Sequence, residues 1–429
     1  MEIGQLIKLE RQRQNMKQEY LASGICVPSY LSRIENGLVI PSEDIQQLIL
    51  MRLNIPLDSL KSEVNQEKLI QFKSQFKTVI NTRNKQKALT LQQDIHNYVE
   101  IHPFEPNRLT LLLLETRLML MLPDQTSIIK KNLVILTGFK KEMDPEQLFY
   151  LYTIQGIVAY QNNQFSQASE FFAQVFTFIK SYRMEDWEMA ELYYISSLSL
   201  LSESRYIMAI DYVKSALSYF NQEILIERSI ECLIILGIAQ KDTGALKEAL
   251  ATFEKAKEIS FKIDSSRFTG MIEHNLGTYH SILKNQKQAL FHFHNSLDAK
   301  IKPNDKIVTI FSLLIEYFKI NDLENAKIWL EKGINLLNLL SEENRIFYSM
   351  HFELFRALIF NTEDIITIFK GALAYFEDNQ DYKHCSIYCN VLAKKLANDK
   401  QYKLATIYYE QGFNFHIKQS KVSSWEELF

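Results

Sequence analysis

A pattern of small and aromatic residues that recurs along most of the chain constrains its fold more than any other feature of the sequence. In a clear copy, the small residue Gly237 is followed twelve positions later by Ala249 and four positions after that by Phe253. The alanines of successive copies are spaced by 41, 40, 40 and 37 residues: Ala168, Ala209, Ala249, Ala289 and Ala326. A fixed period of this size indicates stacked helical hairpins. Over the 429-residue chain it predicts about nine of them, two of which, near Ile128 and Ile366, are poorly marked.

The composition favours an all-helical protein. The chain contains only 12 glycines and 8 prolines in 429 residues, well below average usage, so we expect few tight turns. This shortage argues against an all-β fold and against a glycine-rich loop that binds phosphate. Hydrophobic residues make up 47% of the chain, which is enough to bury a full core. The net charge of −3 does not indicate a nucleic-acid-binding protein, so that function has to rest on a motif.

The first 62 residues are organised differently, as five short helical segments. We expect helices at residues 3–14, 17–22, 29–35 and 42–53, and a short helical turn at 57–60. Asn36-Gly37 provides a left-handed stop for the third segment, and Ser42 is a natural N-cap for the fourth. Two short helices joined by a tight turn predict a helix-turn-helix. The expected domains are residues 1–62, which would bind DNA, and residues 63–429, which would form the repeats.

The run QEYLASGICVPSYLSRIENGLVIPSE, residues 18–43, resembles the helix-turn-helix of the Cro/repressor-like family, also called XRE. The matching residues are Gln18, Glu19, Leu21, Ala22, Leu31, Ser32, Ile34, Glu35, Gly37, Pro41 and Ser42. The segment between Ala22 and Tyr30 is one residue shorter than the usual repressor pattern, and it looks like the form found in the peptide-sensing subgroup of that family. The resemblance also implies that Arg11 pairs with Glu35.

The third helix of such a motif presents its N-terminal half to the major groove, so Ser29, Tyr30 and Arg33 are the candidates for contact with base edges. Gln18 opens the second helix, where its amide and the backbone N–H groups can hold a phosphate, and Ser32 is a further candidate for DNA contact. In the first 37 residues five Lys and Arg side chains face four Glu, so one module should bind DNA poorly and a dimer is expected. The alternative is a degenerate helical bundle that no longer binds DNA.

The repeat pattern resembles the tetratricopeptide repeat, with longer helices than usual. This resemblance implies a right-handed superhelix whose concave inner face, lined by the first helix of each hairpin, commonly binds an extended peptide. By repeat position we expect these side chains at that face: Arg117, Ile157, Tyr194, Ile238, His274, Asn275, Thr278 and Asn390. The carboxamides of Asn275 and Asn390 can donate to and accept from a peptide backbone, and Arg117 can take a carboxylate. The alternative for each polar residue is an ordinary solvated position, and for His274 a packing histidine.

A helix-turn-helix followed directly by a nine-hairpin array resembles the Rap/Rgg/NprR/PlcR/PrgX family of peptide-pheromone receptors, and the length and period are nearest to NprR-like members. The resemblance implies a cytoplasmic transcriptional regulator controlled by a short imported quorum-sensing peptide in the groove of the repeats. The implied partners are a double-stranded DNA operator, the oligopeptide, and further copies of the chain in a homodimer or larger oligomer. Some relatives also bind a phosphorelay response regulator.

A second class of function stays open. The chain can be a protein-binding scaffold or a phosphorelay (sporulation) inhibitor that binds a response regulator, with DNA binding secondary. The intact residues Gln18, Ser29, Tyr30 and Arg33 favour the transcriptional regulator. No Cys/His or Ser/His/Asp grouping rises above chance, so we expect neither an enzyme nor a metal or cofactor site. No stretch is both long and apolar enough to span a membrane.

Overall fold

The computed structural model describes residues 3–55, 66–102, 105–177, 182–263 and 266–420, and within these ranges every regular element is a helix. This confirms the all-α expectation. The chain divides into two compact units, one formed by Met1–Ser199 and Ser215–Arg228 and the other by Leu200–Lys214 and Ser229–Phe429. Among the helices of the described ranges, none combines the length and the apolar character that a bilayer crossing needs.

Four helices form the N-terminal part of the first unit, residues 3–55, which we call the head: α1 (Ile3–Arg13), α2 (Gln18–Ala22), α3 (Pro28–Glu35) and α4 (Glu43–Arg52). Their ends agree with the four expected segments to within one residue. Gly37, with φ of +70°, follows the end of α3 as expected. Gly4 is required where α1 crosses α3, because a Cβ there would collide with the carbonyl oxygen of Ile34. The expected turn at 57–60 and the expected domain boundary at 62 lie outside the described residues.

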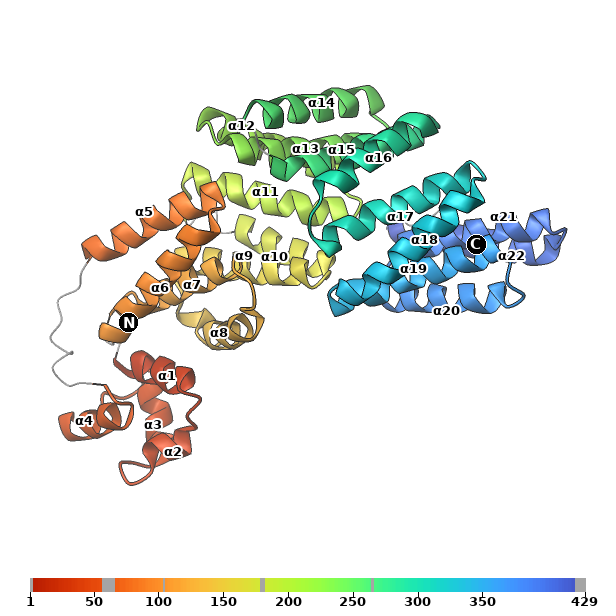
Figure 1. The fold of residues 1–429 in the computed structure, drawn as a ribbon. Helices are drawn as coiled ribbons and strands as arrows, with labels where there is room; N and C mark the ends of the chain where they lie inside the picture. Colours follow the sequence, from red (N-terminus) through yellow and green to blue (C-terminus); the bar gives the residue numbers. More distant parts are fainter. Residues whose placement is uncertain (1–2, 56–65, 103–104, 178–181, 264–265, 421–429) are drawn as a thin grey trace. The chain divides into compact units, whose positions relative to one another are not determined.

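The helices α5 to α22 follow in nine successive pairs, which we call the array (Figure 1). The pairs are α5 (Gln66–Thr82) and α6 (Lys85–Ile101), α7 (Arg108–Met119) and α8 (Thr126–Gly138), α9 (Pro145–Gln161) and α10 (Phe165–Thr177), α11 (Asp186–Ser202) and α12 (Tyr206–Gln222), α13 (Ile226–Asp242) and α14 (Leu246–Lys262), α15 (Ser266–Ile282) and α16 (Gln286–Ala299), α17 (Pro303–Lys319) and α18 (Leu323–Leu336), α19 (Glu342–Phe360) and α20 (Ile365–Asp378), and α21 (Tyr382–Asn398) and α22 (Tyr402–Ser420). The predicted number of hairpins is thus confirmed within the described ranges, and it includes the two that the sequence marks poorly.

The repeated glycine marks a close approach between the two helices of a hairpin. A Cβ added to Gly237 of α13 would lie 2.5 Å from the ring of Phe253 on α14. One added to Gly277 of α15 would lie 2.6 Å from the ring of Phe293 on α16. Both rings are almost fully buried, with 0% and 2% of their surface exposed. The aromatic residue of the pattern therefore fills the space that the missing side chain leaves, and the two helices pack closely.

Each hairpin turn contains one residue in the left-handed region. These residues have φ between +51° and +84°: Arg83, Asp124, Asn163, Ser204, Gly244, Lys284, Asn321, Asn361 and Lys400. The expectation of few tight turns from the shortage of glycine was therefore wrong. One left-handed residue is enough to end the first helix, and a non-glycine residue can adopt this conformation at a cost of about 1–2 kcal/mol. The burial of the hairpin faces offsets that cost.

Helix α1 packs on both the rest of the head and the hairpins of the first unit. Ile7 belongs to the apolar core of the head, whereas Leu9 belongs to the core of the hairpins in the first unit. The ammonium of Lys8 lies 4.6 Å from the centre of the Phe139 ring, just beyond α8. The head is therefore held against the array by buried contacts of α1 as well as by the chain connection.

Replacing Gly237 by alanine tests the glycine–aromatic contact. The new Cβ collides with the buried Phe253 ring, so we expect overpacking to remove about 1–3 kcal/mol of the free energy of unfolding. The better helix propensity of alanine, about 1 kcal/mol, offsets part of this loss. Urea denaturation followed by circular dichroism measures the difference.

The matched control is Gly371→Ala in α20, where an added Cβ meets nothing within 4 Å. This variant should be stabilised by up to about 1 kcal/mol, because only the propensity changes. If the two alanine variants gave the same change, close packing would not be the reason for the glycine at position 237.

Candidate functional site

The second and third helices of the head pack around a small apolar core. Leu21 and Ala22 of α2 and Leu31 and Ile34 of α3 are all fully buried, with 0% exposed. Gly24, with φ of +71°, lies in the turn between the two helices. The absence of a large side chain at Ala22 lets α2 and α3 approach closely. The arrangement is the predicted helix-turn-helix.

The carboxylate of Glu35 connects three helices of the head. Arg11 Nε donates to Glu35 Oε1 at 2.6 Å and Arg11 Nη2 donates to Oε2 at 2.8 Å, which confirms the predicted pair. Gln18 Nε2 donates to the same Oε2 at 2.7 Å. A carboxylate with only 2% of its residue exposed needs several donors, and the Gln18 amide is one of them. The predicted phosphate contact of Gln18 therefore rests on backbone N–H groups at the start of α2.

Helix α3 carries the residues that are predicted to contact base edges. Ser29 and Arg33 are exposed, and Arg33 has no ion-pair partner in the part of the chain that the structure describes. Tyr30 and Ser32 are half-buried, and Tyr30 packs against the head core. Ser29 and Arg33 are thus accessible to a ligand, whereas Tyr30 has a partly structural role. Their contacts with DNA stay predictions.

In the array, Arg117 of α7 is not free. Its Nη2 donates to Glu191 of α11 at 2.8 Å, and only 3% of the residue is exposed. Arg228 of α13 and Arg83 bind the same carboxylate at 2.8 and 2.9 Å. We call these three arginines and Glu191 the arginine cluster. The prediction that Arg117 offers an unoccupied anchor for a carboxylate therefore needs a correction, since Glu191 already occupies it.

The charged groups of the arginine cluster stay ionised despite their burial. Burial opposes ionisation of Glu191, but Arg83, Arg228 and Arg117 outweigh it and lower the pKa of Glu191 to about 2. Burial lowers the pKa of Arg117 to about 10, so it also stays charged at neutral pH. Three guanidinium groups thus contact the carboxylate of Glu191. The ring centre of Tyr194 lies 4.3 Å from Cζ of Arg228, at cation–π distance. Guanidinium groups bind carboxylates, so the partly exposed Arg83 is a candidate contact for an anion.

Sequence reasoning found Arg117 and Tyr194 but missed their neighbours Arg83, Arg228 and Glu191. A signal for Glu191 is present in the sequence, since it is followed only by uncharged residues up to the end of α11. A carboxylate that precedes such a long uncharged run is typical of a buried ion pair. The identity of its partners has no local signal.

The predicted polar anchors Asn275 and Thr278 bond to their own helix. Asn275 Nδ2 donates to the carbonyl oxygen of Met271 at 2.9 Å, and Thr278 Oγ1 donates to the carbonyl oxygen of His274 at 3.0 Å. Each bond joins residues four positions apart on α15. Those carbonyl groups also take part in the helix, so the side chains can turn to a ligand at small cost. The Asn275 carboxamide therefore remains a candidate for binding a peptide backbone.

Asn390 lies in a different place from the one expected. Its Nδ2 donates to the carbonyl oxygen of Ser386 at 2.8 Å. A Cβ added to Gly412 of α22 would lie 3.1 Å from the same Nδ2. The amide thus faces the contact between α21 and α22, because Gly412 allows the helices to approach there. The predicted position of Asn390 on a free inner face needs this correction.

His274 has mainly a packing environment. Its Nδ1 lies 3.2 Å from Thr309 Oγ1, and its ring centre lies 5.4 Å from that of Phe293. Burial and two nearby lysines lower the pKa of His274 to about 3, so the ring is neutral at physiological pH. These contacts favour the packing alternative for this residue. Ile157 and Ile238 are half-buried, as residues on a partly accessible face are.

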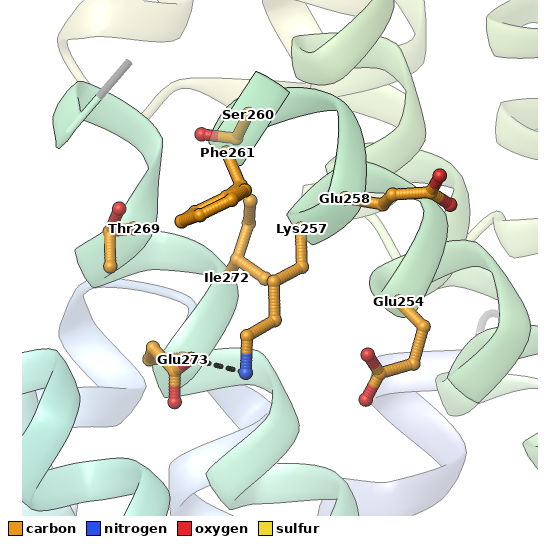
Figure 2. Close-up of a pocket in the computed structure, with 8 residues that line it drawn as sticks. All are labelled: Glu254, Lys257, Glu258, Ser260, Phe261, Thr269, Ile272 and Glu273. Atoms are coloured by element: carbon orange, nitrogen blue, oxygen red, sulfur yellow. Dashed lines mark ion pairs between the residues drawn. The ribbon is translucent and has the colours of Figure 1, made fainter. Parts of the chain in front are cut away.

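A cavity of about 310 Å³ opens in the second unit between α14 and α15 (Figure 2). It is lined by Glu254, Lys257, Glu258, Ser260, Phe261, Thr269, Ile272 and Glu273, which include none of the eight predicted peptide contacts. Lys257 Nζ pairs with Glu273 at 2.8 Å, and His292 Nδ1 lies 2.7 Å from the other oxygen. The charge of Glu273 is thus already balanced, and the cavity is a feature of the seam between two hairpins.

Known proteins resemble both parts of the chain. The sequence model of the helix-turn-helix family matches residues 7–60. The chain is 28% identical over 407 residues to the transcriptional activator NprA of Geobacillus stearothermophilus, and the match covers 92% of this chain and 98% of that protein. The similarity therefore extends over the head and the array together.

Solved structures share the fold of most of the chain. A Rap protein in complex with competence and sporulation factor matches with a TM-score of 0.72 at 17% identity, over 83% of this chain and 99% of its own. NprR in complex with its cognate peptide NprX matches with a TM-score of 0.67 at 17% identity, over 83% and 99%. At these identities the likeness concerns the fold. With the helix-turn-helix and the relative that matches over nearly its full length, these likenesses agree with the resemblance to the Rap/Rgg/NprR/PlcR/PrgX family that the sequence motifs indicate.

Proposed function

We propose that the chain is a DNA-binding transcriptional regulator whose activity is controlled by a short peptide bound to the array. The observation that carries this proposal is the intact third helix of the head, where Ser29 and Arg33 are exposed while the buried Arg11–Glu35 pair holds the motif together. Two relatives support it, since NprA is named a transcriptional activator and NprR was solved with its cognate peptide.

In the proposed complex with operator DNA, α3 lies in the major groove. The guanidinium of Arg33 has the fork geometry that pairs with O6 and N7 of a guanine, and Ser29 lies at the N-terminal end of the helix, where base edges are reached. Contacts of α1 with the array leave both side chains exposed. The head can therefore meet DNA without first leaving the array.

We propose a homodimer as the form that binds DNA. The head has nearly balanced charge, with five Lys and Arg against four Glu in the first 37 residues, so a single head has little attraction for phosphates. Two heads on two half-sites add their contacts, and the array offers surface for the dimer contact. A regulator that works on DNA acts in the cytoplasm of a bacterial cell, and it needs no catalytic group.

We propose two alternative contacts for the peptide, the arginine cluster of the first unit and Asn275 of the second. In the first unit, the arginine cluster would hold a carboxylate, because its three guanidinium groups lie together and 19% of the Arg83 side chain is exposed. In the second unit, the Asn275 carboxamide would bond to the peptide backbone, since it can both donate and accept. Tyr194 and the half-buried Ile157 and Ile238 would provide apolar surface.

Substitution of Arg33 tests the DNA contact. Arg33→Ala should weaken operator binding by about 1–3 kcal/mol per half-site, because one bidentate pair with guanine is lost. Arg33→Lys should keep attraction to phosphate but lose preference for guanine, since an ammonium has no fork. Mobility shift at fixed salt, with operator sequences that the wild-type protein selects from a random DNA pool, measures both effects.

The control for this experiment is Arg345→Ala, which removes an exposed arginine of α19 in the array and should leave DNA binding unchanged. If Arg33→Ala bound the selected DNA like the wild type, α3 would not be the helix that reads it. If the wild type selected no DNA at all, the scaffold that binds a response regulator would become the better account.

Substitution of Asn275 tests the peptide contact in the second unit. Asn275→Ala should weaken binding roughly tenfold or more, because a buried peptide amide without a partner costs about 1–3 kcal/mol. The melting temperature should change little, since the bond that is lost goes only to the helix's own backbone. Calorimetric titration with the peptide that the wild type selects from a library of short peptides measures the affinity.

Asn379→Ala is the matched control, because Asn379 Nδ2 makes the same kind of bond to the carbonyl oxygen of Tyr375, at 2.8 Å, on the second helix of its pair. It should leave peptide affinity unchanged. An unchanged affinity in Asn275→Ala would place the peptide elsewhere, and a large fall in melting temperature would make Asn275 a structural residue.

A further inference from the structure

Helix α7 is buried on every side. All 12 of its residues, from Arg108 to Met119, are buried, including the charged residues Arg108, Glu115 and Arg117. Arg108 and Arg117 lie nine residues apart, which is roughly 14 Å along a helix that rises 1.5 Å per residue. A helix packed on all sides in a dense interior moves as one body, because its neighbours leave no room for a local change.

The first residue of α7 holds the head. Arg108 Nη2 pairs with Glu10 of α1 at 2.5 Å, and the two residues are only 2% and 7% exposed. Arg108 Nη1 also donates to the carbonyl oxygen of Val99 at 3.0 Å. Beside this pair, Arg13 of α1 binds Glu100 of α6 at 3.0 Å. The most deeply buried ionic contact between the head and the array is therefore made by α7.

The other end of α7 enters the arginine cluster. Arg117 binds Glu191 at 2.8 Å, and Glu191 also holds Arg83 and Arg228. A carboxylate that binds at this cluster shares the same guanidinium groups, so it competes with Glu191 for Arg117. The balance of forces on α7 therefore depends on whether an external anion is bound.

We infer that α7 couples the peptide site to the head. An anionic group of the ligand repositions Arg117, and the buried helix transmits this shift to Arg108 and so to the contact with Glu10. The inference rests on the proposed peptide contact at the arginine cluster. Because Ser29 and Arg33 stay exposed while α1 is bound to the array, the contact orients the head and does not cover its DNA-binding surface.

Hydrogen exchange of the full chain, read by mass spectrometry, tests the coupling without any ligand. Glu191→Gln removes the charge that holds Arg117, so the cluster relaxes and α7 shifts. We expect amides of α1 to exchange at least fivefold faster, the lower end of typical coupling between sites, while those of α4 change little. Helix α4 is the internal reference, because its buried residues Ile49 and Leu50 belong to the core of the head alone.

The matched control is Glu188→Gln on the same helix. Glu188 is equally buried, at 2% exposed, but it accepts hydrogen bonds from Tyr150 at 2.8 Å and Tyr182 at 2.9 Å and does not bind α7. This variant should leave exchange in α1 unchanged. If Glu191→Gln does not fold, Arg117→Lys is measured in the same way, because it keeps the charge and loses the paired geometry.

Faster exchange at the C-terminal end of α7 together with unchanged exchange in α1 would overturn the inference. Equal acceleration of α1 and α4 would overturn it as well, because the effect would then be general destabilisation. Since the assay contains neither DNA nor peptide, its result is independent of the proposed function. That function would instead fail if the wild type selected neither a DNA sequence nor a peptide.

Discussion

Close contact between a glycine and a phenylalanine sets the geometry of the clearest hairpins, and the rest of the structure depends on how hairpins pack. Because Gly277 has no side chain, the ring of Phe293 fills the space beside its backbone, and helices α15 and α16 approach closely. A single hairpin formed in this way cannot bury its outer faces, so it needs a neighbour on each side. An apolar core therefore runs through successive hairpins, from α5 to α11 in the first unit and from α16 to α22 in the second.

Stacking of this kind also decides the chemistry of buried charges. Glu188 and Glu191 lie three residues apart on α11, yet their pKa values shift in opposite directions. Burial raises the pKa of Glu188, whose side-chain partners are tyrosine hydroxyls, whereas three arginines lower that of Glu191. One carboxylate thus accepts hydrogen bonds from tyrosine hydroxyls, and the other brings three arginines together.

Helix α1 has two structural roles: it completes the core of the head, and it contacts the array. Ile7 completes the core of the head, while Leu9 and Glu10 pack against the array. Its Arg11 holds Glu35, which leaves Arg33 of α3 free of internal partners among the described residues. The surface proposed for DNA binding is therefore on α3, and the contact proposed for regulation is on α1. The two surfaces do not overlap.

The sequence by itself determined the all-helical fold, the nine hairpins and the helix-turn-helix, while the Arg11–Glu35 pair was implied only by the family resemblance. Short-range patterns predict these features, because a helix period, a helix cap and a contact between a small and an aromatic residue of one hairpin all involve residues that are close along the chain. Only the tertiary structure decided that Glu191 occupies Arg117, since the two residues are 74 positions apart and on helices of different hairpins. It also decided that Asn390 faces Gly412 and that α1 has a second buried face. Which face of a helix contacts its neighbour depends on the packing of whole hairpins, so a local sequence pattern does not predict it.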